Sequence, residues 1–242
     1  MGRYSRRLAP LFADFASITR GQRVLEVGCG PGALTAELAT RVGAEKVAAC
    51  DPADRFVLAC AERVPGADIR TAPAEELPWP DGSFDAVLSQ LVVSFLRDAE
   101  VAIGEMRRVV RPRGLLAACT WDYGSEMQML RTFWDAALTL DPAAPDEARV
   151  MRYSDRDSLR ELWLRAGLGN VETAPLVVQV EYTDFEDYWQ PFLTGTGPGG
   201  AYCVKLEPHH QAALRSECLR RLGTPRTSFT LTARAWAVRG LA

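Results

Sequence analysis

The chain has 242 residues, of which 48% are hydrophobic and 24% charged, and its formal net charge is -3 at pH 7. This length suits one α/β domain with a full core, and the slight acidic excess argues against a nucleic acid held mainly by phosphate contacts. No apolar run is long enough to span a bilayer, and the first residues lack the apolar segment of a signal peptide. We therefore expect a single domain over residues 1–242, cytoplasmic and without a membrane or nucleic-acid partner.

The six cysteines and two histidines lack the spacing of metal ligands. No two cysteines form a C-x-x-C pair, and the histidines are the neighbours His209 and His210. We expect no bound metal and reduced thiols in the core.

A predicted helix over residues 4–17 is followed by the most specific stretch of the chain, Val24–Thr35. There a short apolar and β-branched run ends in three alternating glycines, and a helical pattern follows at once, which predicts a strand, a tight turn and a helix. Gly28, Gly30 and Gly32 let the backbone approach a ligand where a Cβ would block it, and the N-terminus of the helix offers N–H donors. We expect a small polar ligand at this turn.

The glycine spacing alone leaves the ligand open, because Gly28, Gly30 and Ala33 also fit the dinucleotide fingerprint. Glu26 favours a cation, since a carboxylate two residues before the first glycine would repel a pyrophosphate. The pattern resembles motif I of the class I S-adenosylmethionine-dependent methyltransferases, whose cofactor carries a sulfonium and an ammonium. The resemblance implies a cofactor site that includes Glu26, Gly28, Cys29, Gly30 and Gly32.

A second predicted strand, residues 46–50, ends at Asp51, about twenty residues after Gly30. A carboxylate at the tip of this strand can accept both hydroxyls of a ribose. The alternative is a local role as N-cap of the helix that begins near Ala53. We expect ribose binding, because the glycine turn and the acid support each other.

A third predicted strand, residues 68–71, leads into Ala-Pro-Ala-Glu-Glu-Leu-Pro-Trp-Pro-Asp-Gly-Ser-Phe-Asp at residues 72–85. This stretch resembles the loop of the ubiquinone-biosynthesis-type (type 11) methyltransferases. In that family the backbone N–H at the position of Ala74, which Glu75 follows, meets the adenine edge. Pro73 replaces the acid that relatives commonly carry before this alanine.

Because of Pro73, we expect adenine recognition to depend on the Ala74 backbone and on stacking by Pro52 or Phe56. A fourth predicted strand, residues 86–89, brings Gln90 and Leu91 to the carboxyl edge of the sheet. Gln90 either hydrogen-bonds the methionine moiety or the acceptor, or is a strand-end polar group that faces water.

A helix over residues 99–110, a Pro-x-Gly turn and a strand over residues 115–120 complete the resemblance, which covers residues 24–120. It implies a Rossmann-like α/β fold with a seven-stranded, mostly parallel sheet in the order 3-2-1-4-5-7-6. The last strand would be antiparallel, helices would cover both faces, and a helical insertion would follow strand five. Residues 1–120 would form the cofactor-binding half.

Residues 121–226 would hold the acceptor-pocket insertions and strand six, and residues 227–242 the final strand. Trp121, Asp122 and Tyr123 leave the tip of strand five and either contact the acceptor or form a plain loop anchored by a core tryptophan. The candidates for a catalytic base are given by residue type only: Asp122, Tyr123, His209 and His210.

An aromatic stripe from Tyr182 to Phe192 has helical spacing, which favours core packing over a pocket. The glycine-rich stretch Gly195–Gly200 has no preceding strand and no lysine, so it is a poor phosphate cradle, and we expect a mobile loop at the pocket rim. His209 and His210 begin a polar helix that runs to about Leu222, where surface exposure is the plainer interpretation.

The combined evidence predicts S-adenosylmethionine-dependent methyl transfer to a small-molecule acceptor, with S-adenosylhomocysteine as the product. Two alternatives stay open. A nicotinamide-dependent oxidoreductase shares the glycine turn, but Glu26 and the loop of residues 72–85 count against it. A methyltransferase-like domain that binds the cofactor without turnover would have the same cofactor site. The acceptor, the methylated atom and the oligomeric state are not predicted.

Overall fold

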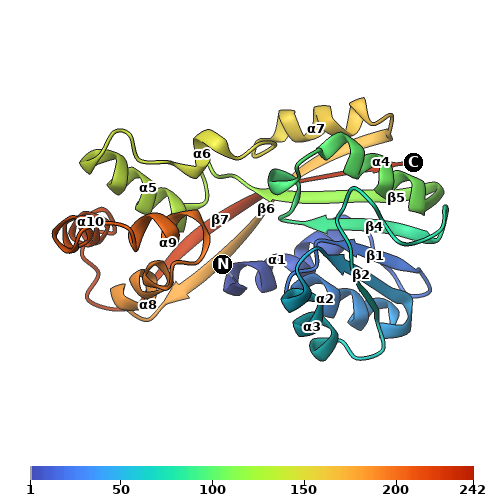
Figure 1. Cartoon of the computed structure of the whole chain (residues 1–242), viewed down its shortest axis with the longest axis horizontal. Coiled ribbons are helices and arrows are strands. Elements are labelled where there is room, and N and C mark those ends of the chain that lie inside the picture. The colour runs from blue at the N-terminus through green and yellow to red at the C-terminus, as the bar shows by residue number, and fades with distance from the viewer. Residues whose placement is uncertain (1) are drawn as a thin grey trace. The chain divides into compact units, whose positions relative to one another are not determined.

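The computed structural model describes residues 2–242. Its centre is one seven-stranded sheet in the order β3-β2-β1-β4-β5-β7-β6 with the last strand antiparallel, so the predicted order is confirmed (Figure 1). The strands are β1 (Val24–Val27), β2 (Val47–Asp51), β3 (Asp68–Thr71), β4 (Phe84–Gln90), β5 (Val110–Trp121), β6 (Gly169–Tyr182) and β7 (Phe229–Leu241).

The chain divides into two compact units. The first unit comprises residues 1–120, 152–176 and 235–242, and the second comprises residues 121–151 and 177–234. Strands β5, β6 and β7 contribute residues to both units. The helices of the first unit are α1 (Gly2–Phe15), α2 (Ala33–Val42), α3 (Asp54–Arg63), α4 (Ala99–Val109) and α7 (Arg156–Arg165).

The first unit owes its layers to strands that are buried on both faces. Every residue of β1 and β2 is buried, as expected for parallel strands between two layers of helices. Helices α4 and α7 share one hydrophobic cluster with strand residues such as Leu25 and Val87. In Figure 1 these two helices lie on one side of the sheet and α2 and α3 on the other, which confirms the expected cover on both faces.

The parallel register brings the ligand-binding ends of the strands to one edge. Val24 of β1 pairs with Val47 of β2 and with Ala86 of β4, so the carboxyl ends of these three strands finish at the same edge. In open α/β sheets, ligands bind at this edge where the strand order reverses, here between β1 and β4.

Strand β5 begins at Val110, five residues earlier than the sequence predicts. Phe84 pairs with Val110 while Ala86 pairs with Leu115, so the Pro-x-Gly stretch is taken up as a bulge. A bulge accommodates proline because its missing N–H interrupts no regular ladder.

The second unit contains α5 (Gln128–Leu140), α6 (Glu147–Val150), α8 (Phe185–Trp189), α9 (Gly197–Cys203) and α10 (Pro208–Arg221). Aromatic rings form its interior. Phe133 of α5 stacks on Phe192 with ring centroids 4.2 Å apart, and Tyr188 and Trp189 are buried beside them. The prediction that the stripe from Tyr182 to Phe192 is core is therefore confirmed.

The prediction of a mobile loop at Gly195–Gly200 is wrong for most of the stretch, because Gly197–Gly200 form the first turn of α9. Gly199 and Gly200 are buried. A Cβ on Gly199 would lie 3.3 Å from the Phe192 ring, and one on Gly200 would lie 3.0 Å from Gly195. The glycines serve close packing against the aromatic core.

Candidate functional site

The glycine turn after β1 requires glycine at its first position. Gly28 has a φ of 78°, a left-handed conformation that favours glycine, and its N–H donates to the Cys50 carbonyl at 2.8 Å. A Cβ on Gly28 would lie 2.3 Å from the Val92 side chain. Only glycine therefore lets the turn pack this closely against Val92.

Glu26 is a buried acid directly beneath this turn. Its side chain is 2% exposed, and the Thr35 hydroxyl donates to its Oε2 at 2.5 Å. Burial raises the pKa of the Glu26 carboxyl well above its ordinary value, and the Thr35 hydrogen bond offsets only part of that. No Lys or Arg forms an ion pair with Glu26 anywhere in residues 2–242. A cation from outside would favour the ionised form.

Asp51 joins the glycine turn to the end of β2. Its Oδ2 accepts the Gly30 N–H and its Oδ1 accepts the Ala53 N–H, both at 3.0 Å. The local role of Asp51 is thus real, although Ala53 itself occupies the N-cap position of α3. Each oxygen of a carboxylate can accept a second hydrogen bond, so Asp51 can hold the turn and still bind two hydroxyls.

A pocket of about 1080 Å³ opens at this edge within the first unit. Its volume is at the upper end for small-molecule sites. Seven predicted cofactor residues line it, namely Gly28, Asp51, Pro52, Phe56, Ala74, Glu75 and Leu91. Five others lie outside its lining, namely Glu26, Cys29, Gly30, Gly32 and Gln90. The first group forms part of the pocket surface, and the second lies in the glycine turn or at the ends of β1 and β4.

The Ala74 N–H has no hydrogen-bond acceptor among residues 2–242. Ala74 is 6% exposed and lines the pocket. Its N–H is therefore available to a ligand in the pocket. A backbone donor without a partner in a pocket wall is suited to a base edge. The prediction for adenine rests on this group.

Gln90 is buried at the end of β4 and does not face water. Its side chain is 7% exposed, and its Nε2 donates to the Ser5 carbonyl of α1 at 3.3 Å. Its Oε1 is the one buried side-chain oxygen or nitrogen without a partner in the described part of the chain. An unpartnered buried carbonyl is costly, which favours a ligand donor at this position.

The sequence did not identify the pocket wall beyond Leu91. Six further residues line it, namely Val92, Phe95, Leu96, Arg97, Asp98 and Val101. They follow β4 through the short 3-10 turn Val93–Phe95 into α4. Their position after a strand that ends at the switch point was the available signal, but no residue among them has a distinctive chemistry.

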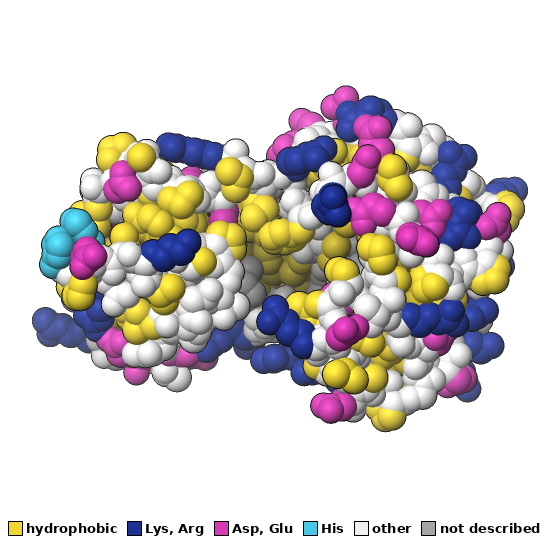
Figure 2. Space-filling view, in the orientation of Figure 1, with side chains coloured by type: hydrophobic (Ala, Val, Ile, Leu, Met, Phe, Trp, Pro, Cys, Tyr) yellow, Lys and Arg dark blue, Asp and Glu magenta, His cyan; other side chains and the backbone are white. Residues whose placement is uncertain are grey.

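The four candidates for a catalytic base lie in the second unit, outside the residues that line the pocket. The Asp122 carboxylate is buried and accepts the Arg234 Nε at 3.0 Å. Tyr123 is buried, and burial raises the pKa of its hydroxyl above its ordinary value. His209 and His210 lie at the surface (Figure 2) at the start of α10, with ring centroids 3.9 Å apart.

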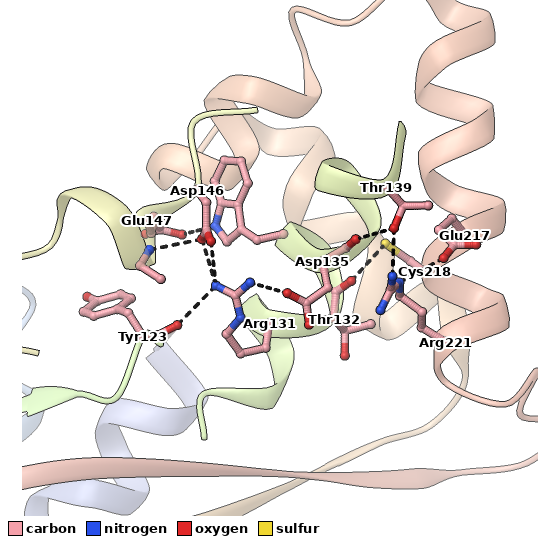
Figure 3. A network of polar contacts seen from close by, with 12 residues as sticks. Tyr123, Arg131, Thr132, Asp135, Thr139, Asp146, Glu147, Glu217, Cys218 and Arg221 are labelled. Atoms are coloured by element: carbon pink, nitrogen blue, oxygen red, sulfur yellow. Dashed lines mark hydrogen bonds and ion pairs between the residues drawn. The ribbon is translucent and has the colours of Figure 1, made fainter. Parts of the chain in front are cut away.

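The polar network of the second unit centres on Arg131 (Figure 3). Its Nη1 donates to Asp146 Oδ1 at 2.8 Å and to the Tyr123 carbonyl at 3.3 Å, and its Nη2 bonds Asp135. Next to it, Trp134 Nε1 donates to Glu147 at 2.7 Å. These contacts join α5, α6 and the end of β5 inside one unit.

No group of three or more His, Cys, Asp or Glu side chains among residues 2–242 could hold a metal ion. None of the helices in that range combines the length and apolar character needed to cross a membrane.

The fold and the pocket together define an α/β protein with a ligand-sized pocket at the switch point of its sheet. Residues 25–118 match the family model described as a methyltransferase domain. The chain is 32% identical over 161 residues to a malonyl-(acyl-carrier protein) O-methyltransferase of Geobacter sulfurreducens, which is 65% of this chain and 60% of that relative. It is 40% identical over 105 residues to a ubiquinone biosynthesis O-methyltransferase of Rhizobium etli, 41% of each chain.

A solved structure supports the fold. The phosphoethanolamine N-methyltransferase 2 of Haemonchus contortus, in complex with phosphomonomethylethanolamine and S-adenosylhomocysteine, has a TM-score of 0.59 at 16% identity. The match covers 98% of this chain and 52% of that chain. Residues 25–118 match a methyltransferase domain, as the motifs predicted, and the chain spans 60% and 41% of the lengths of the two curated relatives named above. The residues at the switch point fit the cofactor of that family, since the glycine turn excludes side chains and an unpaired acid lies beneath it.

Proposed function

We propose that this protein transfers the methyl group of S-adenosylmethionine to a small organic acceptor and leaves S-adenosylhomocysteine. The observation that carries the proposal is the pair of acids at the switch point. Glu26 is buried without a cationic side chain to balance it, and Asp51 presents its carboxylate in the pocket wall. Together they are complementary to a ligand with a positive charge at one end and a ribose in the middle.

The bound sulfonium supplies an activated methyl group, so the protein mainly has to orient the reactants and exclude water. Asp51 would accept the ribose hydroxyls while it holds the Gly30 N–H. The free Ala74 N–H would meet the adenine edge, and Glu26 would offset the positive charge near the glycine turn. Gln90 Oε1, which has no partner, would accept from the ammonium of the methionine part.

The acceptor loses a proton when it is a hydroxyl or an acidic carbon, and that proton needs a base. Tyr123, His209 and His210 stay candidates. The Arg234 guanidinium holds the Asp122 carboxylate in place through Nε and Nη2, which favours a role in orienting the acceptor over one in proton transfer. Trp121 and Tyr123 are the other predicted acceptor contacts. The cytoplasmic location rests on the sequence alone.

The deciding experiment replaces Asp51 by alanine and measures S-adenosylhomocysteine binding by calorimetry. The loss of charge-assisted hydrogen bonds to two hydroxyls predicts at least an approximately hundredfold weaker affinity. Asp54→Ala is the matched control, because Asp54 is an exposed carboxylate three residues further on that bonds Thr71 and does not line the pocket. Equal affinities of the two variants would contradict the cofactor site.

The alternatives are separated by two further measurements on the unmodified protein. Tight NADH binding without S-adenosylhomocysteine binding would indicate a nicotinamide-dependent oxidoreductase. S-adenosylhomocysteine binding with no methyl transfer to any member of an acceptor panel would indicate a binding protein without turnover.

A further inference from the structure

One wall of the pocket, residues 72–76, has no regular secondary structure of its own. A single turn hydrogen bond, from the Glu76 N–H to the Pro73 carbonyl at 3.3 Å, lies within it. At its first end the wall follows β3, and the Ala72 N–H donates to the Asp51 carbonyl at 3.2 Å. The Asp98 N–H also donates to Glu75 Oε1 within the wall, at 3.4 Å. The main chain of the wall otherwise depends on what holds its second end, the segment Leu77–Asp81.

Two elements hold the second end. From β3, Arg70 Nη1 donates to the Pro78 carbonyl at 2.6 Å and Asp68 accepts Trp79 Nε1 at 2.9 Å. The larger set of contacts comes from Arg108, which lies in the last turn of α4. Its Nη2 donates to the Leu77 carbonyl and its Nη1 to the Trp79 carbonyl, both at 2.9 Å. Nη1 also donates to Asp81 Oδ1 at 2.8 Å. One guanidinium thus binds every second residue of the segment, namely Leu77, Trp79 and Asp81.

Glu105, one turn earlier in α4, completes the arrangement. It accepts Arg108 Nε at 2.7 Å and Nη2 at 2.8 Å, and its Oε2 accepts the Leu77 N–H at 2.9 Å. All five N–H groups of the guanidinium therefore have an acceptor. Arg108 holds the pKa of the Glu105 carboxyl below its usual range.

The neighbour Arg107 has no part in this arrangement. Its side chain is exposed and donates to the Ala166 carbonyl at the end of α7, at 2.9 Å. The sequence offers no distinction between the two arginines, which it presents as one solvated basic group. The structure distinguishes them by the loop that each one binds.

We propose that Arg108, oriented by Glu105, is a positioning residue for the nucleoside end of the cofactor. It does not line the pocket and does not touch the ligand. It fixes the main chain of Leu77–Asp81, and through it the wall that carries the free Ala74 N–H. This inference rests on the proposed function, because the wall matters only when an adenine lies against it.

The test compares Arg108→Lys with Arg107→Lys. Lysine keeps the charge but cannot reproduce five donors in a planar fork. With at least two loop hydrogen bonds lost, the affinity of Arg108→Lys for S-adenosylhomocysteine should fall about tenfold or more, and that for adenosine by the same factor. Amide exchange in residues 72–82 should become faster, and the KM for S-adenosylmethionine should rise with kcat unchanged. Arg107→Lys should match the unmodified protein.

Equal affinities and exchange rates in the two lysine variants would overturn the inference while the proposed function stands. Failure of the unmodified protein to bind S-adenosylhomocysteine would instead overturn the proposed function. If Arg108→Lys does not fold, Glu105→Gln gives the same information, since it removes the charge that orients Arg108 and keeps the side-chain volume. An unchanged affinity in a folded Glu105→Gln protein would also overturn the inference.

Discussion

The two units of the chain surround most of their buried carboxylates differently. In the second unit, Asp146 meets Arg131 and Asp122 meets Arg234, so each of these two acids pairs with a guanidinium from the same unit. Glu147 of that unit is buried with the Trp134 Nε1–H as its hydrogen-bond donor and lies next to the Asp146–Arg131 pair. In the first unit, Glu26 has only the Thr35 hydroxyl as a partner. A paired buried acid builds structure, whereas an unpaired one is costly unless a cation arrives. The proposed function therefore places the positively charged part of the ligand at Glu26, which lies next to the glycine turn.

The glycine turn offers the strongest way to break the site in the first unit. Gly28→Ala places an alanine in a left-handed backbone conformation. Its Cβ would also lie 2.3 Å from the Val92 side chain, which is a steric clash. We expect S-adenosylhomocysteine affinity to fall by more than about hundredfold, equivalent to roughly 3 kcal/mol. Gly21→Ala is the control, because Gly21 has a φ of 96° but nothing within 4 Å of an added Cβ. An equal effect of both would show that backbone strain alone explains the loss.

Arg131→Met tests the second unit, where Asp146 is paired with a guanidinium. It leaves the buried Asp146 without its guanidinium, so the free energy of unfolding should fall by about 3–5 kcal/mol. Urea unfolding measures this change, and calorimetry should find S-adenosylhomocysteine affinity unchanged. Arg215→Met, which breaks an exposed pair with Glu186, should cost at most about 1 kcal/mol. A large loss of affinity in Arg131→Met would refute the separation of roles.

The pH dependence of Glu26→Gln tests the unpaired acid. Because the folded state raises the pKa of Glu26, its stabilising contribution is present below the unfolded value near 4.5 and is lost as pH rises towards the folded pKa. The unmodified protein should therefore lose stability relative to Glu26→Gln over this range. Thermal unfolding at a series of pH values measures the difference.

The same acid predicts proton release on binding, because a bound cation lowers the pKa of Glu26 again. Below the raised pKa, calorimetry in buffers of different ionisation enthalpy should detect this release in the unmodified protein and not in Glu26→Gln. The affinity of the variant should fall about tenfold. In the thermal unfolding experiment, stability curves that run parallel with pH for the two proteins would contradict the raised pKa of Glu26.

The smallest effect is expected from the surface histidines. The double variant His209→Ala with His210→Ala removes two exposed rings from the start of α10, so stability should change by less than about 0.5 kcal/mol. Methyl transfer should stay within about twofold of the unmodified rate. A loss of about hundredfold or more would instead identify a histidine as the base.

Local patterns predicted most of the first unit. The strand before Gly28 and the strand that ends at Asp51 each depend on neighbouring residues, and the resemblance supplied the strand order. The predicted Pro-x-Gly turn is instead a bulge within β5, because its conformation depends on pairing with β4. The second unit was harder to predict from the sequence, because the role of its aromatic residues depends on partners distant in the sequence. Gly199 illustrates this point, since its glycine is explained by the Phe192 ring and not by a loop.

The sequence by itself determined the cofactor class, because the glycine turn and the two acids that suit this cofactor lie within short stretches of chain. Only the tertiary structure decided how each group is used. It showed that Glu26 has no cationic partner, that Gln90 has an unpaired carbonyl, and that Arg108 binds the segment next to the pocket wall while Arg107 does not. The physical reason is that hydrogen bonds and desolvation depend on distances between groups, and folding sets those distances.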